Sequence, residues 1–193
     1  MRRIERSEIL PIGEYEPLRE RFRNRVIAEK RPRRVKLGDH MSAVFENRDS
    51  VMLQIQEMLR TERISSEAGI LHEIETYNDL IPGENQLSLT LFVEIPDKNL
   101  RDQMLTELAG LERSIYLEVD GEAFEAKEGI VHGAREDRTT AVHYMKISLP
   151  EQAASRVRNK EASLTLSVRH PRYSVQSPLQ SAALAQLAAD LMA

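Results

Sequence analysis

The sequence of 193 residues contains no cysteine and no tryptophan, and aromatic residues make up only 5% of it. The absence of cysteine excludes disulfide bonds, thiolate nucleophiles, zinc ribbons and cysteine-ligated iron–sulfur clusters held by this chain. The scarcity of aromatic residues requires an aliphatic core, and the hydrophobic content of 41% is enough to form one. We therefore expect a core of Leu, Ile, Val and Met. The absence of cysteine is consistent with a reducing compartment.

Long apolar runs are also missing. No stretch approaches the roughly 20 apolar residues that a membrane-spanning helix needs. The N-terminal residues Met1–Arg6 include three arginines and lack the apolar segment of a secretory signal. We therefore expect a cytoplasmic protein with no membrane partner.

The net charge of −4 is unevenly distributed along the chain. Residues 1–36 hold twelve Lys or Arg and six Asp or Glu, so they carry +6 and the remainder carries −10. A basic arm on an acidic body favours an interaction tail or self-complementary packing. The run Lys30–Arg34 has no interleaved aromatic side chains, and no nucleic-acid-binding motif is present. We therefore expect a solvated or acid-paired face there, not a nucleic-acid site.

Helical periodicity dominates the first part of the chain. Within residues 45–82, apolar residues recur at three- and four-residue steps and predict two helices, the first with Asn47 or Asp49 as N-cap. The short connection between them favours an antiparallel pair. An earlier helix, residues 14–29, has a thin apolar stripe and needs a partner surface. Such helices suit an intramolecular core and a homodimer interface equally well.

Strand patterns appear before and after these helices. Residues 34–45 predict a strand interrupted by a turn at Gly38-Asp39, and Asp120-Gly121 is the strongest hairpin signal in the chain. Alternating apolar residues predict further strands, with helices between them and a polar loop at 135–138. The strands are expected at residues 87–95, 115–119, 122–127, 140–149 and 162–168, and the helices at residues 97–111, 150–158 and 177–191.

These elements predict an α+β fold, because the helices are inserted among antiparallel strands. We expect a single domain over residues 1–193. Its mainly helical N-terminal part, residues 1–83, forms a layer packed on a mostly antiparallel sheet with inserted helices, residues 84–193. For the last helix, Ser177-Pro178 reads as a capping box with proline at the first helical position.

Histidine and carboxylate side chains provide two candidate metal sites. His72, Glu75 and Asp79 share one helix face, because steps of three and four residues return to the same side. Their order is His-x-x-Glu, once, whereas di-metal bundles use paired Glu-x-x-His. His143 and His170 lie on the apolar faces of two strands and meet only if those strands are neighbours. A solvated helix face and buried histidines bonded to backbone are the simpler explanations.

Charged and polar side chains elsewhere are candidates for ligand binding. Glu46 ends a strand just before Arg48, and Glu57 precedes Arg60 by three residues, so each spacing predicts an ion pair. Tyr173 follows the second of the two histidines and is a further candidate. No Gly-rich phosphate loop, Ser/His/Asp order or dinucleotide fingerprint accompanies these residues. Catalytic residues, cofactors and enzymatic activity therefore stay unassigned.

Several segments resemble a known family. They are the lead Ser7–Tyr15, the run Phe45–Arg60, the segment Tyr77–Leu80 and the late segment His170–Tyr173. Together they are similar to the bacterial family catalogued as domain of unknown function 3501, and the similarity covers nearly the whole chain. The resemblance implies a gene neighbourhood with rubrerythrin-like di-iron proteins and an iron–sulfur oxidoreductase of the heterodisulfide-reductase type. It implies no activity and no catalytic residues.

Three functions are consistent with these patterns. The preferred one is an accessory or interaction protein of a cytoplasmic redox or oxidative-stress system, whose partner is an iron–sulfur oxidoreductase or a rubrerythrin-like protein. The charge asymmetry would steer the docking of such a partner. One alternative is a metal-dependent enzyme that uses a His/carboxylate site. The other is a small-molecule binding module whose ligand lies against Met52 and Met58, because methionine side chains adapt to shape.

Overall fold

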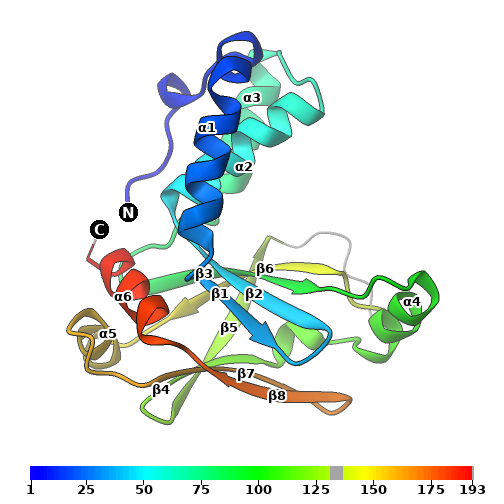
Figure 1. Ribbon diagram of the computed structural model, residues 1–193, viewed down its shortest axis with the longest axis vertical. Coiled ribbons are helices and arrows are strands. Elements are labelled where there is room, and N and C mark those ends of the chain that lie inside the picture. Colours follow the sequence, from blue (N-terminus) through cyan, green and yellow to red (C-terminus); the bar gives the residue numbers. More distant parts are fainter. Residues whose placement is uncertain (131–136, 193) are drawn as a thin grey trace.

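A computed structural model describes residues 1–130 and 137–192 (Figure 1). In these residues, six α-helices and eight strands form a mixed α+β fold. The helices are α1 (Ile12–Lys30), α2 (Arg48–Thr61), α3 (Glu67–Asn78), α4 (Lys98–Glu107), α5 (Glu151–Arg158) and α6 (Ser181–Asp190). The strands are β1 (Arg34–Leu37), β2 (Met41–Glu46), β3 (Gln86–Val93), β4 (Ile115–Val119), β5 (Glu122–Ile130), β6 (Val142–Ser148), β7 (Leu164–His170) and β8 (Tyr173–Pro178).

The strands form one antiparallel sheet in the order β1-β2-β3-β6-β5-β4-β7-β8, which curls into a nearly closed barrel (Figure 1). Among the described residues no ladder joins β1 to β8, and side chains connect these two edges instead. The hydroxyl of Tyr173 donates to the carbonyl of Leu37 at 2.6 Å, and the hydroxyl of Ser177 donates to the carbonyl of Lys36 at 2.5 Å. We call this line of contact the seam.

The turn between β1 and β2 contains a glycine, Gly38, that lies directly against the seam residue Tyr173. Gly38 has a φ of +69°, a conformation that favours glycine. A Cβ atom at this position would lie 2.4 Å from the hydroxyl oxygen of Tyr173. Glycine is therefore required both by the backbone conformation and by the close approach of the tyrosine.

The interior of the barrel follows from strand alternation. Successive side chains of a strand point to opposite faces, so every second residue of β3 enters the core. Leu87, Leu89 and Leu91 are buried inside the barrel, as expected. The intervening Ser88 and Thr90 are buried too, and all six residues of β2 are buried. The outer face of these two strands is therefore covered, although it carries polar side chains.

The cover is the helical tier, which consists of α1, α2, α3 and the N-terminal residues 1–11 (Figure 1). The tier has a hydrophobic cluster of its own, separate from that of the barrel. It gathers Val51, Ile55 and Leu59 from α2 with Ile70, Ile74 and Tyr77 from α3 and Ile4 and Ile9 from the N-terminal segment. The described residues thus form two hydrophobic clusters, one in the barrel and one in the tier, with a polar layer between them.

Several local predictions are confirmed. Asn47 is the N-cap of α2, and its side chain accepts a hydrogen bond from the backbone N–H of Ser50. Asp120 and Gly121 form the hairpin turn between β4 and β5, both with positive φ. The interruption at Gly38 separates β1 from β2. No helix in the described part of the chain is both long and apolar enough to cross a membrane.

The C-terminal boundaries differ from the prediction. Strand β8 was not expected, and Ser177 and Pro178 belong to it, so the predicted capping box is wrong. Helix α6 starts at Ser181, and its N-cap Gln180 makes no side-chain capping bond. The reason is that β8 pairs along its length with β7, which keeps this segment extended. Of the polar loop predicted at 135–138, residues 135–136 lie outside the described residues.

Candidate functional site

A cavity of about 180 Å³ lies where the helical tier meets the barrel. We call it the junction pocket. Polar groups from α1, α2, β2, β3 and β6 line it together with an apolar wall. The lining residues are Lys30, Glu46, Ser50, Val51, Gln54, Leu80, Thr90, Phe92, Val142 and Tyr144.

Glu46 is the centre of the polar layer in this pocket. It ends β2 on the outer face of the barrel, and it is 6% exposed because the tier covers it. Its carboxylate accepts from the hydroxyl of Thr90 at 2.7 Å and from the hydroxyl of Ser50 at 2.5 Å, and Lys30 Nζ lies 3.1 Å from Oε2. Three donors from three elements thus meet one buried carboxylate, which ties α1, α2 and β3 to β2.

Tyr144 lies on the other side of the junction pocket, on β6. Burial raises the pKa of its hydroxyl to about 12, and the neighbouring Tyr77 and Glu46 add to this effect. The hydroxyl therefore stays protonated and neutral over the physiological pH range. The pocket combines a neutral phenol with an amide and a neutralised ion pair, which suits hydrogen bonding of a small polar molecule.

Glu57 and Arg60 both contact α1, and the predicted ion pair between them is wrong. Glu57 accepts two hydrogen bonds from Arg19, at 2.8 and 2.7 Å, and one from the hydroxyl of Tyr15 at 2.7 Å. Arg60 donates to Glu16 at 2.7 Å. Because α1 packs antiparallel to this face of α2, its charged side chains are nearer than the neighbours three residues along the helix. These pairs hold α1 to the tier.

The pKa of Glu57 predicts an acid-sensitive contact. Hydrogen bonds from Arg19 lower this pKa below its ordinary value of 4.5, the Tyr15 hydroxyl lowers it further, and burial opposes both. A lowered folded-state pKa means that Glu57 stabilises the folded state above about pH 4.5, and that this stability is lost as the pH falls through the folded-state pKa. We expect Glu57→Gln to be less stable than wild type at pH 7 and to lose less stability between pH 5 and pH 3, measured by urea unfolding.

The matched control for this prediction is Glu75→Gln, which neutralises an exposed carboxylate on α3. Its unfolding free energy should follow the wild-type pH dependence. The prediction would be contradicted if Glu57→Gln and the wild type lost the same unfolding free energy between pH 5 and pH 3.

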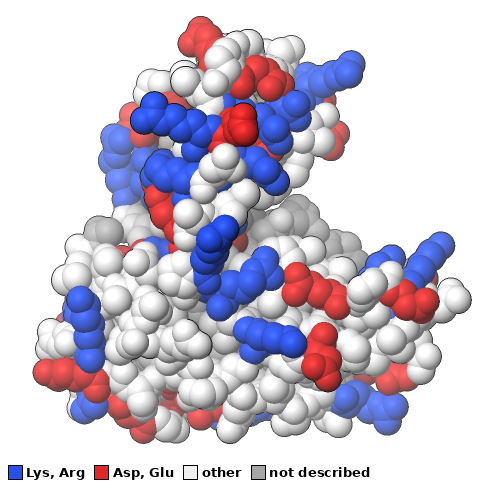
Figure 2. Space-filling model, viewed as in Figure 1, with Lys and Arg blue, Asp and Glu red and all other residues white. Residues whose placement is uncertain are grey.

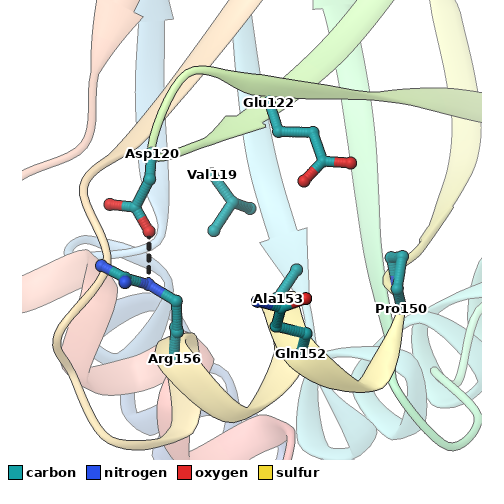
Figure 3. A pocket seen from close by; sticks show the side chains of 7 residues that line it. All are labelled: Val119, Asp120, Glu122, Pro150, Gln152, Ala153 and Arg156. Atoms are coloured by element: carbon teal, nitrogen blue, oxygen red, sulfur yellow. Dashed lines mark ion pairs between the residues drawn. The ribbon is translucent and has the colours of Figure 1, made fainter.

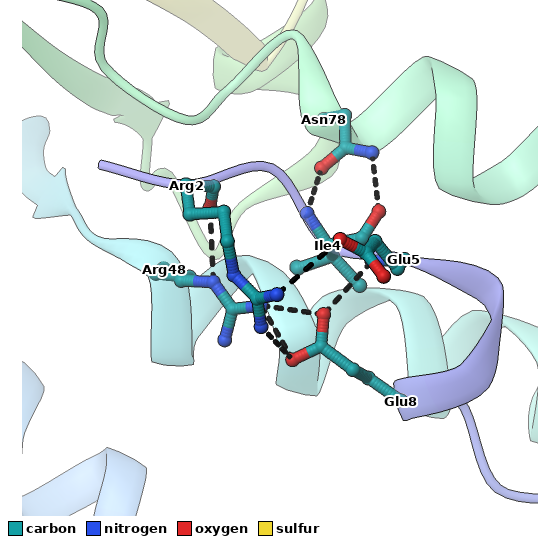
Figure 4. Close-up of polar contacts among 6 residues, drawn as sticks. All are labelled: Arg2, Ile4, Glu5, Glu8, Arg48 and Asn78. Atoms are coloured by element: carbon teal, nitrogen blue, oxygen red, sulfur yellow. Dashed lines mark hydrogen bonds and ion pairs between the residues drawn. The ribbon is translucent and has the colours of Figure 1, made fainter.

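Arg48 binds the N-terminal segment, so the predicted Glu46–Arg48 ion pair is also wrong. Its guanidinium donates to Glu8 at 2.6 and 2.7 Å and to the backbone carbonyl of Arg2 at 2.9 Å (Figure 4). Asn78 clamps the backbone of Ile4 through both its N–H and its carbonyl. These contacts fasten residues 2–8 across α2 and α3, which is a structural role for Arg48.

His143 and His170 lie on strands that are not neighbours, because β5 and β4 separate β6 from β7 in the sheet. His143 is buried, with Nδ1 2.9 Å from Glu128 and Nε2 3.0 Å from the carbonyl of Thr140. His170 Nε2 lies 3.1 Å from the carbonyl of Ala109. The sheet order therefore does not supply the adjacency on which a joint site depends.

The other predicted residues are spread over the surface. His72 and Glu75 are exposed on α3, and Asp79 pairs with Arg3 at 3.3 Å. Within residues 1–130 and 137–192 no group of three or more His, Asp or Glu side chains is placed to hold a metal ion. Tyr173 belongs to the seam, where its hydroxyl also accepts from the backbone N–H of His40 at 3.3 Å.

A cavity of about 270 Å³ lies between the β4–β5 turn and α5 (Figure 3). Arg156 donates to Asp120 at 2.6 Å on one side of it. The backbone N–H of Ser163 lowers the pKa of Asp120, and Arg156 lowers it further. Asp120 and Arg156 thus neutralise each other, while the carboxylate of Glu122 also lines the cavity, and none of the predicted site residues is among the described lining residues.

A third hollow, the helical groove, runs between α1 and α2 and has a volume of about 290 Å³. Its floor is fixed by the amide of Gln56, which bonds both the N–H and the carbonyl of Leu10. Leu18 on its rim is 51% exposed. The lining residues are mostly apolar: Glu8, Leu10, Tyr15, Leu18, Phe22, Met52 and Gln56.

Sequence reasoning identified Glu46 but missed its partners. Lys30, Ser50, Thr90 and Tyr144 come from four elements, and no local spacing connects them. Thr90 gave no signal either, because it continues the ordinary alternation of apolar and polar residues in β3.

The fold and the polar junction define a class of protein: an antiparallel, nearly closed barrel that carries a helical tier over one face. The family model described as "Protein of unknown function (DUF3501)" matches residues 3–191, and the chain belongs to this family. The crystal structure of a novel protein of unknown function from Burkholderia pseudomallei K96243 is similar, with a TM-score of 0.91 and 30% sequence identity. The match covers 98% of this chain and 100% of that one. No curated protein matches the chain.

Proposed function

We propose that this chain is an accessory protein of a redox system that acts by binding a partner protein through the helical groove. The observation that carries the proposal is the exposed apolar rim of that groove. Leu18 is 51% exposed on a helix that projects away from the barrel (Figure 1). Phe22 and Met52 lie beside it and are only partly buried. An apolar surface of this kind is typical of binding sites.

The charge around the groove indicates the chemistry of the partner. Leu18, Arg21 and Phe22 lie on one face of α1, because three- and four-residue steps return to the same side. Arg21 is exposed and forms no ion pair with the described residues. The first 36 residues carry a net positive charge. An amphipathic segment with acidic side chains beside an apolar face would complement this surface.

The identity of the partner rests on the family resemblance. It implies an iron–sulfur oxidoreductase or a rubrerythrin-like protein. The chain has no cysteine and therefore no thiol chemistry of its own, so electrons would travel through the partner. The role proposed for this chain is to position or stabilise that partner.

The test is a binding measurement between the purified chain and each of these two partners from the same organism. We expect Leu18→Asp to weaken binding by at least about 30-fold, since a central apolar anchor contributes on the order of 2 kcal/mol. The matched control is Leu71→Asp, which changes a 47% exposed leucine on α3. We also expect the association rate to fall with rising salt concentration. No association of the wild-type protein with either partner would refute the proposal.

The helical groove also favours a second candidate, a small-molecule binding module. Met52 lines the groove, whereas Met58 is not among its lining residues, and thioether side chains adapt to ligand shape. Thermal-shift screening with apolar metabolites tests this candidate. Stabilisation that Leu18→Asp abolishes and Leu71→Asp retains would favour it over protein binding.

Four further hypotheses concern metal-dependent activity, location, oligomeric state and domain organisation, and the first three have direct tests. A metal-dependent enzyme using His72, Glu75 and Asp79, or the histidines of β6 and β7, is tested by elemental analysis of untagged protein. A cytoplasmic location and a homodimer are tested by fractionation and by sedimentation. We also propose that residues 1–193 form one domain, in which the tier and the barrel share the junction pocket.

A further inference from the structure

We infer that a second groove, at the seam, binds the phosphoryl group of a small molecule. This basic groove has a volume of about 300 Å³ and lies between β1, β8 and the start of α6. Among its described lining residues, three side chains are cationic and none is acidic. The lining residues are Arg31, Pro32, Arg34, Val35, Lys36, Ser177, Pro178, Gln180, Ala182 and Ala183.

Strand geometry places the cations together. Residues two apart in a strand share a face, so Arg34 and Lys36 both project outward from β1 while Val35 enters the core. Arg31 caps the C-terminus of α1, just before the strand. Figure 2 shows Lys and Arg side chains gathered where the tier descends onto the barrel.

Two of the three cations lack an acidic partner. Arg31 and Lys36 form no ion pair with the described residues, whereas most arginines of the helical tier do. Arg34 pairs with Glu94 at 3.2 Å, donates to the hydroxyl of Ser42 at 2.6 Å and lies over the ring of Phe92, so its charge already has partners on β2 and β3. Arg33, which lies between Arg31 and Arg34 in sequence, turns inward to Asp190 and adds no charge to the groove. The local field is therefore positive although the chain as a whole is acidic.

The opposite wall is formed by β8 and the start of α6. Ser177 donates its only hydroxyl proton to the carbonyl of Lys36, which ties the two strand edges together, so the free donors on this wall include the backbone N–H groups that begin α6. Ala182 and Ala183 belong to the first turn of α6, a helix without a side-chain cap and without acidic residues in that turn. Arginine and lysine charges facing such a turn match phosphate oxygens in charge and in hydrogen-bonding capacity.

A groove of about 300 Å³ has room for a phosphate monoester. The helical groove is apolar and uses different residues, so this inference is independent of the proposed function. The shared chemistry of the candidates is a phosphoryl group carrying two negative charges.

The test is titration calorimetry of the full chain with inorganic phosphate and, separately, with ribose 5-phosphate, at constant ionic strength against sodium chloride. We expect saturable binding that Lys36→Glu weakens by about tenfold or more. The control is Arg23→Glu, which makes the same charge change on the exposed surface of α1 away from the groove. Tighter binding of the sugar phosphate identifies an ester as the ligand, and equal affinities identify the phosphoryl group alone.

A second variant guards against a folding defect. Arg31→Gln with Lys36→Gln removes both unpaired charges without reversing them, and its unfolding midpoint should match that of the wild type. Binding of both phosphates that is no stronger than that of chloride overturns the inference. So does an affinity of the double variant equal to that of the wild type.

Discussion

Replacing Asp190 by alanine is expected to destabilise the folded state by about 3–5 kcal/mol, the usual cost of leaving one member of a buried ion pair without its partner. Asp190 accepts two hydrogen bonds from Arg33, at 2.5 and 2.9 Å, and Gln186 accepts a third. Arg33 is only 3% exposed, so its charge cannot turn to water after the substitution. Urea unfolding monitored by circular dichroism measures the effect.

The controls separate burial from charge. Glu67→Ala removes an exposed partner of Arg6 and should cost less than about 1 kcal/mol. The double substitution Arg33→Met with Asp190→Leu replaces the pair by apolar side chains and should recover most of the lost stability, since buried pairs often break even with such replacements. An Asp190→Ala protein as stable as the wild type would show that Arg33 finds another partner.

The second large effect is expected at the polar layer between the tier and the barrel. Glu46→Ala should cost about 2–3 kcal/mol, because the hydroxyls of Ser50 and Thr90 and the ammonium group of Lys30 lose their shared acceptor. Lys30 is 29% exposed in its side chain and can regain water, which keeps the loss below that at Asp190. Unfolding by urea, followed separately by hydrogen exchange in α2 and β3, measures it.

A double-mutant cycle isolates the ionic part of this contact. Glu46→Gln keeps the shape of the side chain but faces Lys30 without charge, and Lys30→Met removes the charge on the other side. We expect the two substitutions together to cost clearly less than the sum of the single ones, because the groups interact directly. Strict additivity would mean that Lys30 and Glu46 do not stabilise each other.

The sequence predicted the elements well, because their signals are local. Asn47 supplies the α2 cap within three residues, and Asp120-Gly121 dictates a hairpin by its own conformational preference. Strand β8 was missed because its stability comes from pairing with β7, and its outward positions are polar and exposed. Only two apolar residues of β8, Tyr173 and Val175, alternate with polar ones before Pro178, and a run this short is a weak strand signal.

The candidate site was predictable only in part, since charge partners are set by tertiary contacts. Glu57 was assigned to a neighbour three residues away, yet it bonds an arginine 38 residues distant. Arg33 belongs to a run that reads as a solvated face, yet it is buried against the last helix. The ion-pair partner of such a charged residue can be distant in sequence, so it is identified only once the fold is known.

The seam has a consequence for how the molecule avoids self-association. Unpaired strand edges are templates for intermolecular β-pairing and fibril growth. Here the two edges face one another, tied by Tyr173 and Ser177, with α6 lying beside them and anchored through Asp190. The final helix therefore protects these two edges. A chain that ends before α6 is expected to expose the edges of β1 and β8 and to aggregate by intermolecular β-pairing.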